Sequence, residues 1–83
     1  MPHFTKTIEI ENGFMNFYFN RIFTPQGTRY HVSTMGRNKK SVIFHMEQKG
    51  SEWCLIKEDA DVYWLKAIEK KLSDAITEHR RED

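Results

Sequence analysis

Cysteine is nearly absent from this sequence, since Cys54 is the only one among 83 residues. A single thiol cannot close an internal disulfide, which excludes a small secreted scaffold held together by disulfide bridges. Long apolar runs are missing as well, and the first ten residues lack the basic and apolar segments of a secretory signal. We therefore expect a cytoplasmic protein that does not enter a membrane.

Catalytic and metal-binding motifs are lacking too. Four histidines and Cys54 are the only obvious nucleophile, base or zinc-ligand types, and none of them forms a CxxC or HExxH pattern. The sequence offers no visible set of nucleophile, base and orienting group. We expect a protein that is not an enzyme, that uses no cofactor and that has no small-molecule substrate.

Apolar residues are present in the amount that one core needs. Hydrophobic residues make up 39% of the chain and aromatic residues 13%, and these proportions argue against disorder. A chain of this length suits one packed domain, because a second core needs more residues. The sequence predicts a single domain over residues 1–83.

Turn signals recur at short intervals as far as Ser51. They lie at Asn12-Gly13, Thr24-Pro25-Gln26-Gly27, Gly36 to Lys40 and Gln48 to Ser51. The segments between them alternate apolar and polar residues, which predicts strands at about 4–11, 14–23, 28–35, 41–47 and 52–57. We expect an antiparallel β-meander of four to five strands.

From Asp59 the apolar residues recur at helical spacing, which predicts a helix over about residues 60–80. Its apolar stripe comprises Trp64, Leu65, Ile68, Leu72, Ala75, Ile76 and His79, and its polar side comprises Lys66, Lys70, Ser73, Asp74 and Thr77. A helix of this kind buries its apolar side against a sheet. The expected fold class is α+β, with one C-terminal amphipathic helix packed on one face of the sheet.

The turns also predict the strand register. Two-residue loops at Asn12-Gly13 and Lys49-Gly50 and a three-residue loop at residues 37–39 place these residues opposite each other: Ile10 and Met15, Ile8 and Phe17, Met46 and Trp53, Phe44 and Leu55, Thr34 and Val42, Val32 and Phe44. Each register keeps apolar side chains on one face. The strand residues that we expect to face Leu65, Ile68, Leu72 and Ile76 of the helix are Ile8, Ile10, Met15, Phe17, Phe19, Val32, Phe44, Met46, Trp53 and Leu55.

Arg21 disturbs this pattern, because it shares the inward parity of Met15, Phe17 and Phe19. We expect a β-bulge near Asn20-Arg21 or at Gly27 that restores the alternation.

The third hairpin places His31 opposite His45 on the outward face, next to Glu47 and Asn20. Two histidines and a carboxylate can coordinate a metal, but pairs of solvated imidazoles on a polar sheet face are more common, so we expect no metal site.

Positive charge gathers in the first part of the chain. Residues 1–50 hold seven Lys or Arg against three acids, whereas the remainder holds six against nine, and the formal net charge is +1. The segment from Gly36 to Lys40 places Arg37, Lys39 and Lys40 on one hairpin tip, as in loops that contact phosphates. Lysine-rich tips also keep sheet edges from aggregating, so the sequence leaves both roles open.

The outward sheet face is polar and carries an aromatic ring. Its expected members are Thr7, Glu9, Asn16, Tyr18, Asn20, Arg29, His31, Ser33 and His45. Amides, an arginine and an aromatic side chain stack on single-stranded bases and form hydrogen bonds with them. An ordinary solvated face has a similar composition.

Consecutive strands followed by one C-terminal helix, from Phe14-Met15-Asn16-Phe17-Tyr18-Phe19 to Ile76, resemble the single-stranded nucleic-acid-binding fold of PUR-alpha repeats, Whirly proteins and positive-cofactor coactivators. The resemblance implies a dimer that binds single-stranded DNA or RNA on its sheet. It also implies that Tyr18, Asn20, Arg29 and His31 are the sheet contacts.

The sequence therefore predicts a non-catalytic binding module. Its expected nucleic-acid contacts are Tyr18, Asn20, Arg29, His31, Arg37, Lys39 and Lys40. The alternative is a homodimeric protein-interaction domain with no nucleic-acid role, in which Tyr63 and Trp64 lie in the subunit contact.

Overall fold

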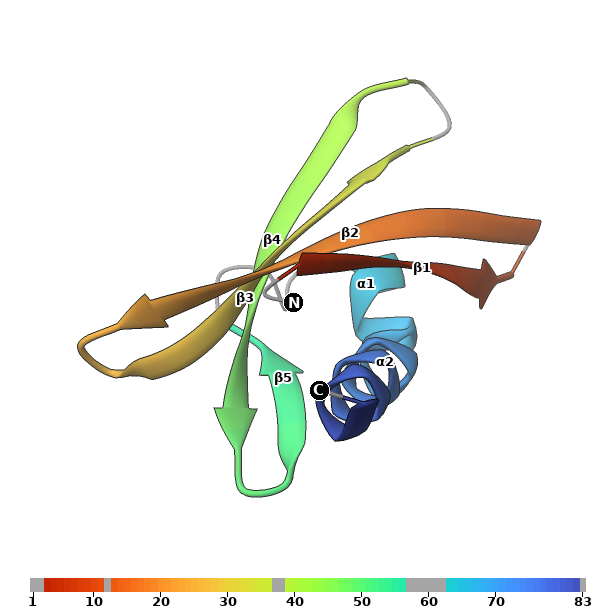
Figure 1. Ribbon diagram of the computed structural model, residues 1–83. Helices are drawn as coiled ribbons and strands as arrows, with labels where there is room; N and C mark the ends of the chain where they lie inside the picture. The colour runs from red at the N-terminus through yellow and green to blue at the C-terminus, as the bar shows by residue number, and fades with distance from the viewer. Residues whose placement is uncertain (1–2, 12, 37–38, 57–62, 83) are drawn as a thin grey trace.

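Five antiparallel strands and two helices follow one another in this computed structural model, which describes residues 3–11, 13–36, 39–56 and 63–82 (Figure 1). The strands are β1 (His3–Ile10), β2 (Gly13–Thr24), β3 (Gly27–Met35), β4 (Ser41–Lys49) and β5 (Glu52–Leu55), and the helices are α1 (Tyr63–Ala67) and α2 (Glu69–Glu82). Each strand pairs with the next, in the order β1-β2-β3-β4-β5. The expected α+β fold with an antiparallel meander is confirmed.

The helical part departs from the single helix that we expected. A turn at Ile68 separates α1 from α2, because the N–H of Ile68 donates to the carbonyl of Leu65, three residues back, at 3.1 Å. A bond of this span tightens the chain relative to an α-helix. Both Leu65 and Ile68 are nevertheless buried. The expected helix start at residues 60–62 lies outside the described residues.

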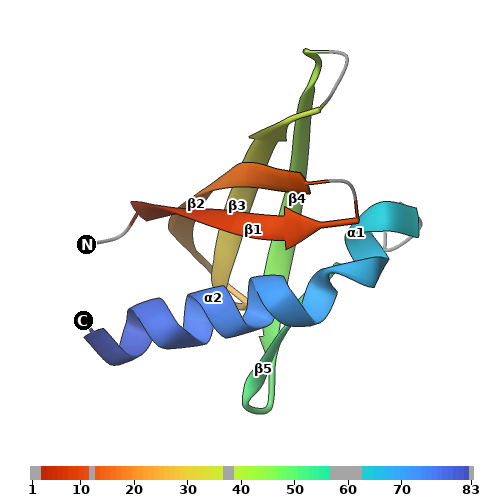
Figure 2. The same cartoon turned by 90° about the vertical axis from the view of Figure 1, so that its right-hand side faces the viewer.

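Helix α2 lies between the two edge strands, β1 and β5 (Figure 2). On the β5 side, the backbone N–H groups of Trp53 and Leu55 donate to Ser73 Oγ and Glu69 Oε2, each at 2.9 Å. On the β1 side, Lys71 Nζ donates to the carbonyl of Glu9 at 2.9 Å. The helix therefore supplies hydrogen-bond partners to both sheet edges, which would otherwise be open to pairing with another chain. Ser73 was expected on the solvent side and is instead buried.

The core lies between the sheet and the helices, as expected. The buried hydrophobic side chains are Ile8, Phe17, Phe19, Tyr30, Val32, Phe44, Met46, Trp53, Leu55, Leu65, Ile68, Leu72, Ala75 and Ile76, with Phe4, Ile10, Met15, Val42 and Trp64 packed against them. All the strand residues that we expected to face the helices belong to this set.

Two aromatic residues of the core were not expected. The Tyr30 ring meets that of Trp53 edge to face at 5.0 Å, and Phe4 stacks on Phe19 at 4.5 Å and on His79 at 4.0 Å.

Two hairpin registers differ from the expected ones by two residues. Ile8 pairs with Met15 and Ile10 with Gly13, while Met46 pairs with Leu55. The β4–β5 loop is Gly50-Ser51, with the positive φ of 65° at Gly50. A shift of two residues leaves every side chain on its original face, so the core prediction holds although the pairing was wrong.

The same shift in the first hairpin sets Phe4 opposite Phe19, where the two rings stack. Asn12, the first residue of the expected two-residue loop, lies outside the described residues.

The third hairpin register is confirmed, with Val32 opposite Phe44 and Thr34 opposite Val42. The expected bulge in the second hairpin was wrong, because β2 and β3 pair without interruption from Phe17 and Thr34 to the Pro25-Gln26 loop. Arg21 keeps its inward parity, with its guanidinium 5.6 Å from the Phe23 ring. This hairpin extends beyond the helix (Figure 1), and Phe23 is 77% exposed. The core therefore does not cover the inner face at this end of the sheet, and a charged side chain is accommodated there.

Candidate functional site

The outer face of the sheet, defined as the face turned away from α2, carries the sequence-predicted site residues of the strands. The register arranges them in lateral rows. One row consists of His3, Asn20, His31 and His45, and the next consists of Thr5, Tyr18, Ser33 and Ile43. The structure thus brings Tyr18, Asn20 and His31 together on adjoining positions of these rows, with Arg29 one outer position further along β3.

His31 and His45 form the expected cross-strand pair, with ring centroids 5.0 Å apart in an edge-on arrangement. The nearby carboxylate of Glu47 is engaged elsewhere, because it lies 3.8 Å from both Arg29 and Lys49. Among the residues that the structure describes, no group of three or more His, Cys, Asp or Glu side chains is placed to hold a metal ion. The pair therefore presents two imidazoles on the polar face.

This face carries two exposed aromatic rings, whereas the sequence interpretation identified only Tyr18. Tyr18 is 52% exposed, and Phe14, on the same strand and the same face, is 70% exposed. Met35 and Ile43 are also more than half exposed at neighbouring outer positions of β3 and β4. Strand alternation alone could have assigned Phe14 to the outer face, because Phe14 is two residues from Asn16 and four residues from Tyr18.

The middle of the outer face contains no carboxylate. The two central rows hold only hydroxyl, amide, imidazole, phenol and aliphatic groups. At its margins lie Glu47, which is compensated by Arg29 and Lys49, and Glu9, which is opposite Phe14. An anionic ligand laid over these rows would meet neutral groups and hydrogen-bond donors, without a like charge beneath it.

The β3–β4 tip continues two of the strands that carry this face (Figure 1). Lys39 and Lys40 are exposed there, and the loop closes through hydrogen bonds from the Lys39 N–H to the Gly36 carbonyl and from the Gly36 N–H to the Lys40 carbonyl. Lys39 adopts a positive φ of 63°. Arg37, the third cation expected at the tip, lies outside the described residues.

None of the described helices is both long enough and apolar enough to cross a lipid bilayer. Comparison of the chain with protein-family models, with curated proteins and with solved structures finds no match.

Proposed function

We propose that this protein is a non-catalytic module that binds single-stranded DNA or RNA on the outer face of its sheet. The observation that supports this most is the exposed ring of Tyr18 within two lateral rows that contain no carboxylate, with a second exposed ring, Phe14, further along the same face of β2. The inner face is occupied by the core and α2, so the outer face is the broad surface open to a ligand.

Bases would stack on Tyr18 and Phe14. The two residues are four positions apart on β2, which corresponds to about 13 Å along a strand. They therefore offer separate platforms to different bases of one strand. The amide of Asn20 and the imidazole of His31 adjoin Tyr18 and supply donors and acceptors for base edges.

Phosphates would meet the cations at the end of the face. Lys39 and Lys40 are exposed on the β3–β4 tip, and Arg37 precedes them in the sequence. Arg29 is partly neutralised by Glu47 at 3.8 Å. With a formal net charge of only +1, few phosphate contacts are available, and the affinity is expected to be weak and sensitive to salt.

A titration of fluorescently labelled oligonucleotides at low ionic strength tests the proposal. We expect binding of single-stranded DNA or RNA at micromolar protein concentrations, and much weaker binding of a duplex, whose bases cannot stack on protein rings. The absence of binding at tens of micromolar protein would overturn it.

Self-association through the same face is a second candidate function. Met35 and Ile43 are 57% and 55% exposed on adjoining strands, and aliphatic side chains favour a protein partner over a base. Sedimentation equilibrium separates the candidates. A dimer that Ile43→Asp dissociates, in a protein that binds no oligonucleotide, would favour this second function.

A further inference from the structure

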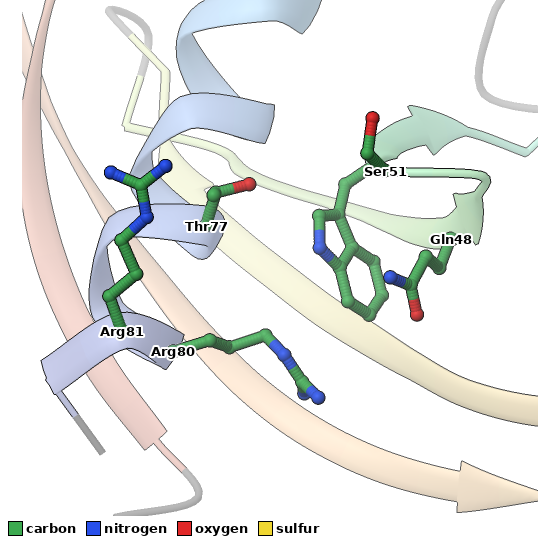
Figure 3. A pocket seen from close by; sticks show the side chains of 6 residues that line it. Gln48, Ser51, Thr77, Arg80 and Arg81 are labelled. Atoms are coloured by element: carbon green, nitrogen blue, oxygen red, sulfur yellow. The ribbon is translucent and has the colours of Figure 1, made fainter.

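A small pocket lies on the other side of the molecule, between the end of α2 and the β4–β5 hairpin. It has a volume of about 200 Å³ and is lined by Gln48, Ser51, Trp53, Thr77, Arg80 and Arg81. Figure 3 shows helix residues Thr77, Arg80 and Arg81 on one side and hairpin residues Gln48 and Ser51 on the other. The pocket thus joins two segments that are distant in the sequence, and most of its lining side chains are exposed to a ligand in solution.

The lining is cationic and rich in hydrogen-bond donors. It contains two guanidinium groups, two hydroxyls and one amide, but no carboxylate. The neighbouring helix acids are occupied elsewhere, because Glu78 lies 3.9 Å from Lys6 and Asp74 lies 3.9 Å from Lys70. Within residues 3–11, 13–36, 39–56 and 63–81, neither Arg80 nor Arg81 takes part in an ion pair.

Helix α2 carries both cations at its end, and one of them makes a further contact with the core. They lie in the last turn of α2, where the helix dipole favours positive charge. The Arg80 guanidinium also lies 5.7 Å from the Trp53 ring, and that ring is almost fully buried. Arg80 is therefore partly positioned before any ligand arrives, which lowers the entropic cost of binding.

We propose that this pocket binds a phosphate monoester group. Guanidinium groups match the oxygens of phosphate in bidentate geometry. Thr77 adds a hydroxyl from the same helix, and Ser51 and Gln48 add a hydroxyl and an amide from the opposite wall. A carboxylate has two oxygens and would leave much of this donor set unused, whereas a phosphate monoester offers three terminal oxygens. The volume of about 200 Å³ suits a phosphoryl group with a small attached residue.

This site is separate from the outer face. Gln48 and Trp53 pair with each other and share the inward parity of Met46 and Leu55. The inference therefore does not depend on nucleic-acid binding by Tyr18 or by the β3–β4 tip.

The two tryptophans of the chain provide a built-in comparison, since Trp53 lines the pocket and Trp64 lies outside it on α1. In ¹H–¹⁵N spectra, inorganic phosphate and glycerol 3-phosphate should shift the indole resonance of Trp53 and leave that of Trp64 in place. Sodium chloride at the same ionic strength supplies the reference. Comparison of a 5′-phosphorylated trinucleotide with its unphosphorylated form shows whether a phosphate at the end of a nucleic-acid strand binds as well as glycerol 3-phosphate.

Removing the cations should remove the response. Arg80→Gln/Arg81→Gln should weaken phosphate binding at least about tenfold, because each charge-assisted contact to an anion is strong. Lys6→Gln/Lys70→Gln removes the same charge from two exposed ion pairs and should leave it within about twofold. Since Arg80 also contacts Trp53, Arg81→Gln alone provides a variant that spares this contact. The proposal is overturned if chloride reproduces the Trp53 shift, or if both double variants lose binding equally.

Discussion

The hydroxyl of Ser73 on α2 accepts a hydrogen bond of 2.9 Å from the backbone N–H of Trp53 on β5. Because β5 is an edge strand, this N–H has no neighbouring strand on that side. One turn earlier on the helix, Glu69 does the same for Leu55. The spacing of four residues on the helix thus matches a spacing of two residues on the strand, and this match fixes how α2 lies along the sheet edge.

Ser73→Ala should destabilise the fold by about 1 to 3 kcal/mol, because it leaves the buried Trp53 N–H without an acceptor. Urea unfolding measures this change. Asp74→Ala, at the exposed neighbouring position, should change the free energy of unfolding by less than about 0.5 kcal/mol. Equal losses in the two variants would mean that the hydrogen bond contributes nothing.

Glu69 should make the stability of the fold depend on acid. Burial acts to raise the pKa of its carboxyl, but the Leu55 N–H, the Lys66 ammonium and the charge of Lys49 outweigh burial and hold the pKa below its ordinary value of 4.5. The unfolded chain therefore binds this proton more tightly than the folded chain does. The contribution of Glu69 is present above the unfolded-state pKa and is lost as the pH falls through the lower folded-state value.

Glu69→Gln should accordingly reduce stability at neutral pH and flatten the loss of stability between about pH 6 and pH 3. Urea midpoints across this range measure both effects. An unchanged pH profile in the variant would show that Glu69 is not the group responsible.

Leu72 is fully buried among the strand residues of the core. Leu72→Ala should cost about 2 to 5 kcal/mol, through lost apolar burial and the cavity that remains. This is a large share of the stability of a domain of this size. Tyr63, which is 82% exposed, provides the control, and Tyr63→Ala should be nearly neutral in the same unfolding experiment.

Strand parity was the part of the structure that the sequence predicted best. Phe17, Phe44 and Trp53 lie inside because a period of two assigns each residue to a face whichever partner it pairs with. The exact partners depend on loop geometry, and the glycine conformations at Gly13 and Gly50 were not distinguishable from the sequence. A two-residue error in register therefore left the core prediction intact.

Side chains that act across distant segments could not be predicted in the same way. Helical periodicity predicts that Ser73 is exposed to solvent. Only the placement of α2 against the β5 edge gives its hydroxyl a buried hydrogen-bond partner. Arg21 likewise led to the wrong prediction of a bulge. Strand alternation placed its side chain on the inner face, but it could not show that the sheet extends past the helix at Phe23. The pocket at Arg80 has the same origin, since its two walls come from separate elements.

The cations of the β3–β4 tip should control how salt affects oligonucleotide binding. Replacing Arg37, Lys39 and Lys40 by Gln should flatten the plot of log affinity against log salt, by about 0.7 for each single-strand phosphate that the protein no longer neutralises. Titrations at several salt concentrations measure this slope. Lys6→Gln/Lys70→Gln, away from the outer face, should leave it nearly unchanged. If the tip variant keeps the wild-type slope, the phosphates do not contact this loop.

The ring of Tyr18 should contribute to affinity without affecting the salt dependence. Tyr18→Ala removes a stacking platform and should weaken binding of single-stranded oligonucleotides by about 1 to 3 kcal/mol, with the salt slope preserved because stacking releases no counterions. Tyr18→Phe keeps the ring and should bind nearly as well as the wild type. Since Tyr18 is half exposed, neither variant should alter the unfolding midpoint greatly. Wild-type affinity in Tyr18→Ala would remove this residue from the interface, and the same result in Phe14→Ala would leave the outer face without a stacking role.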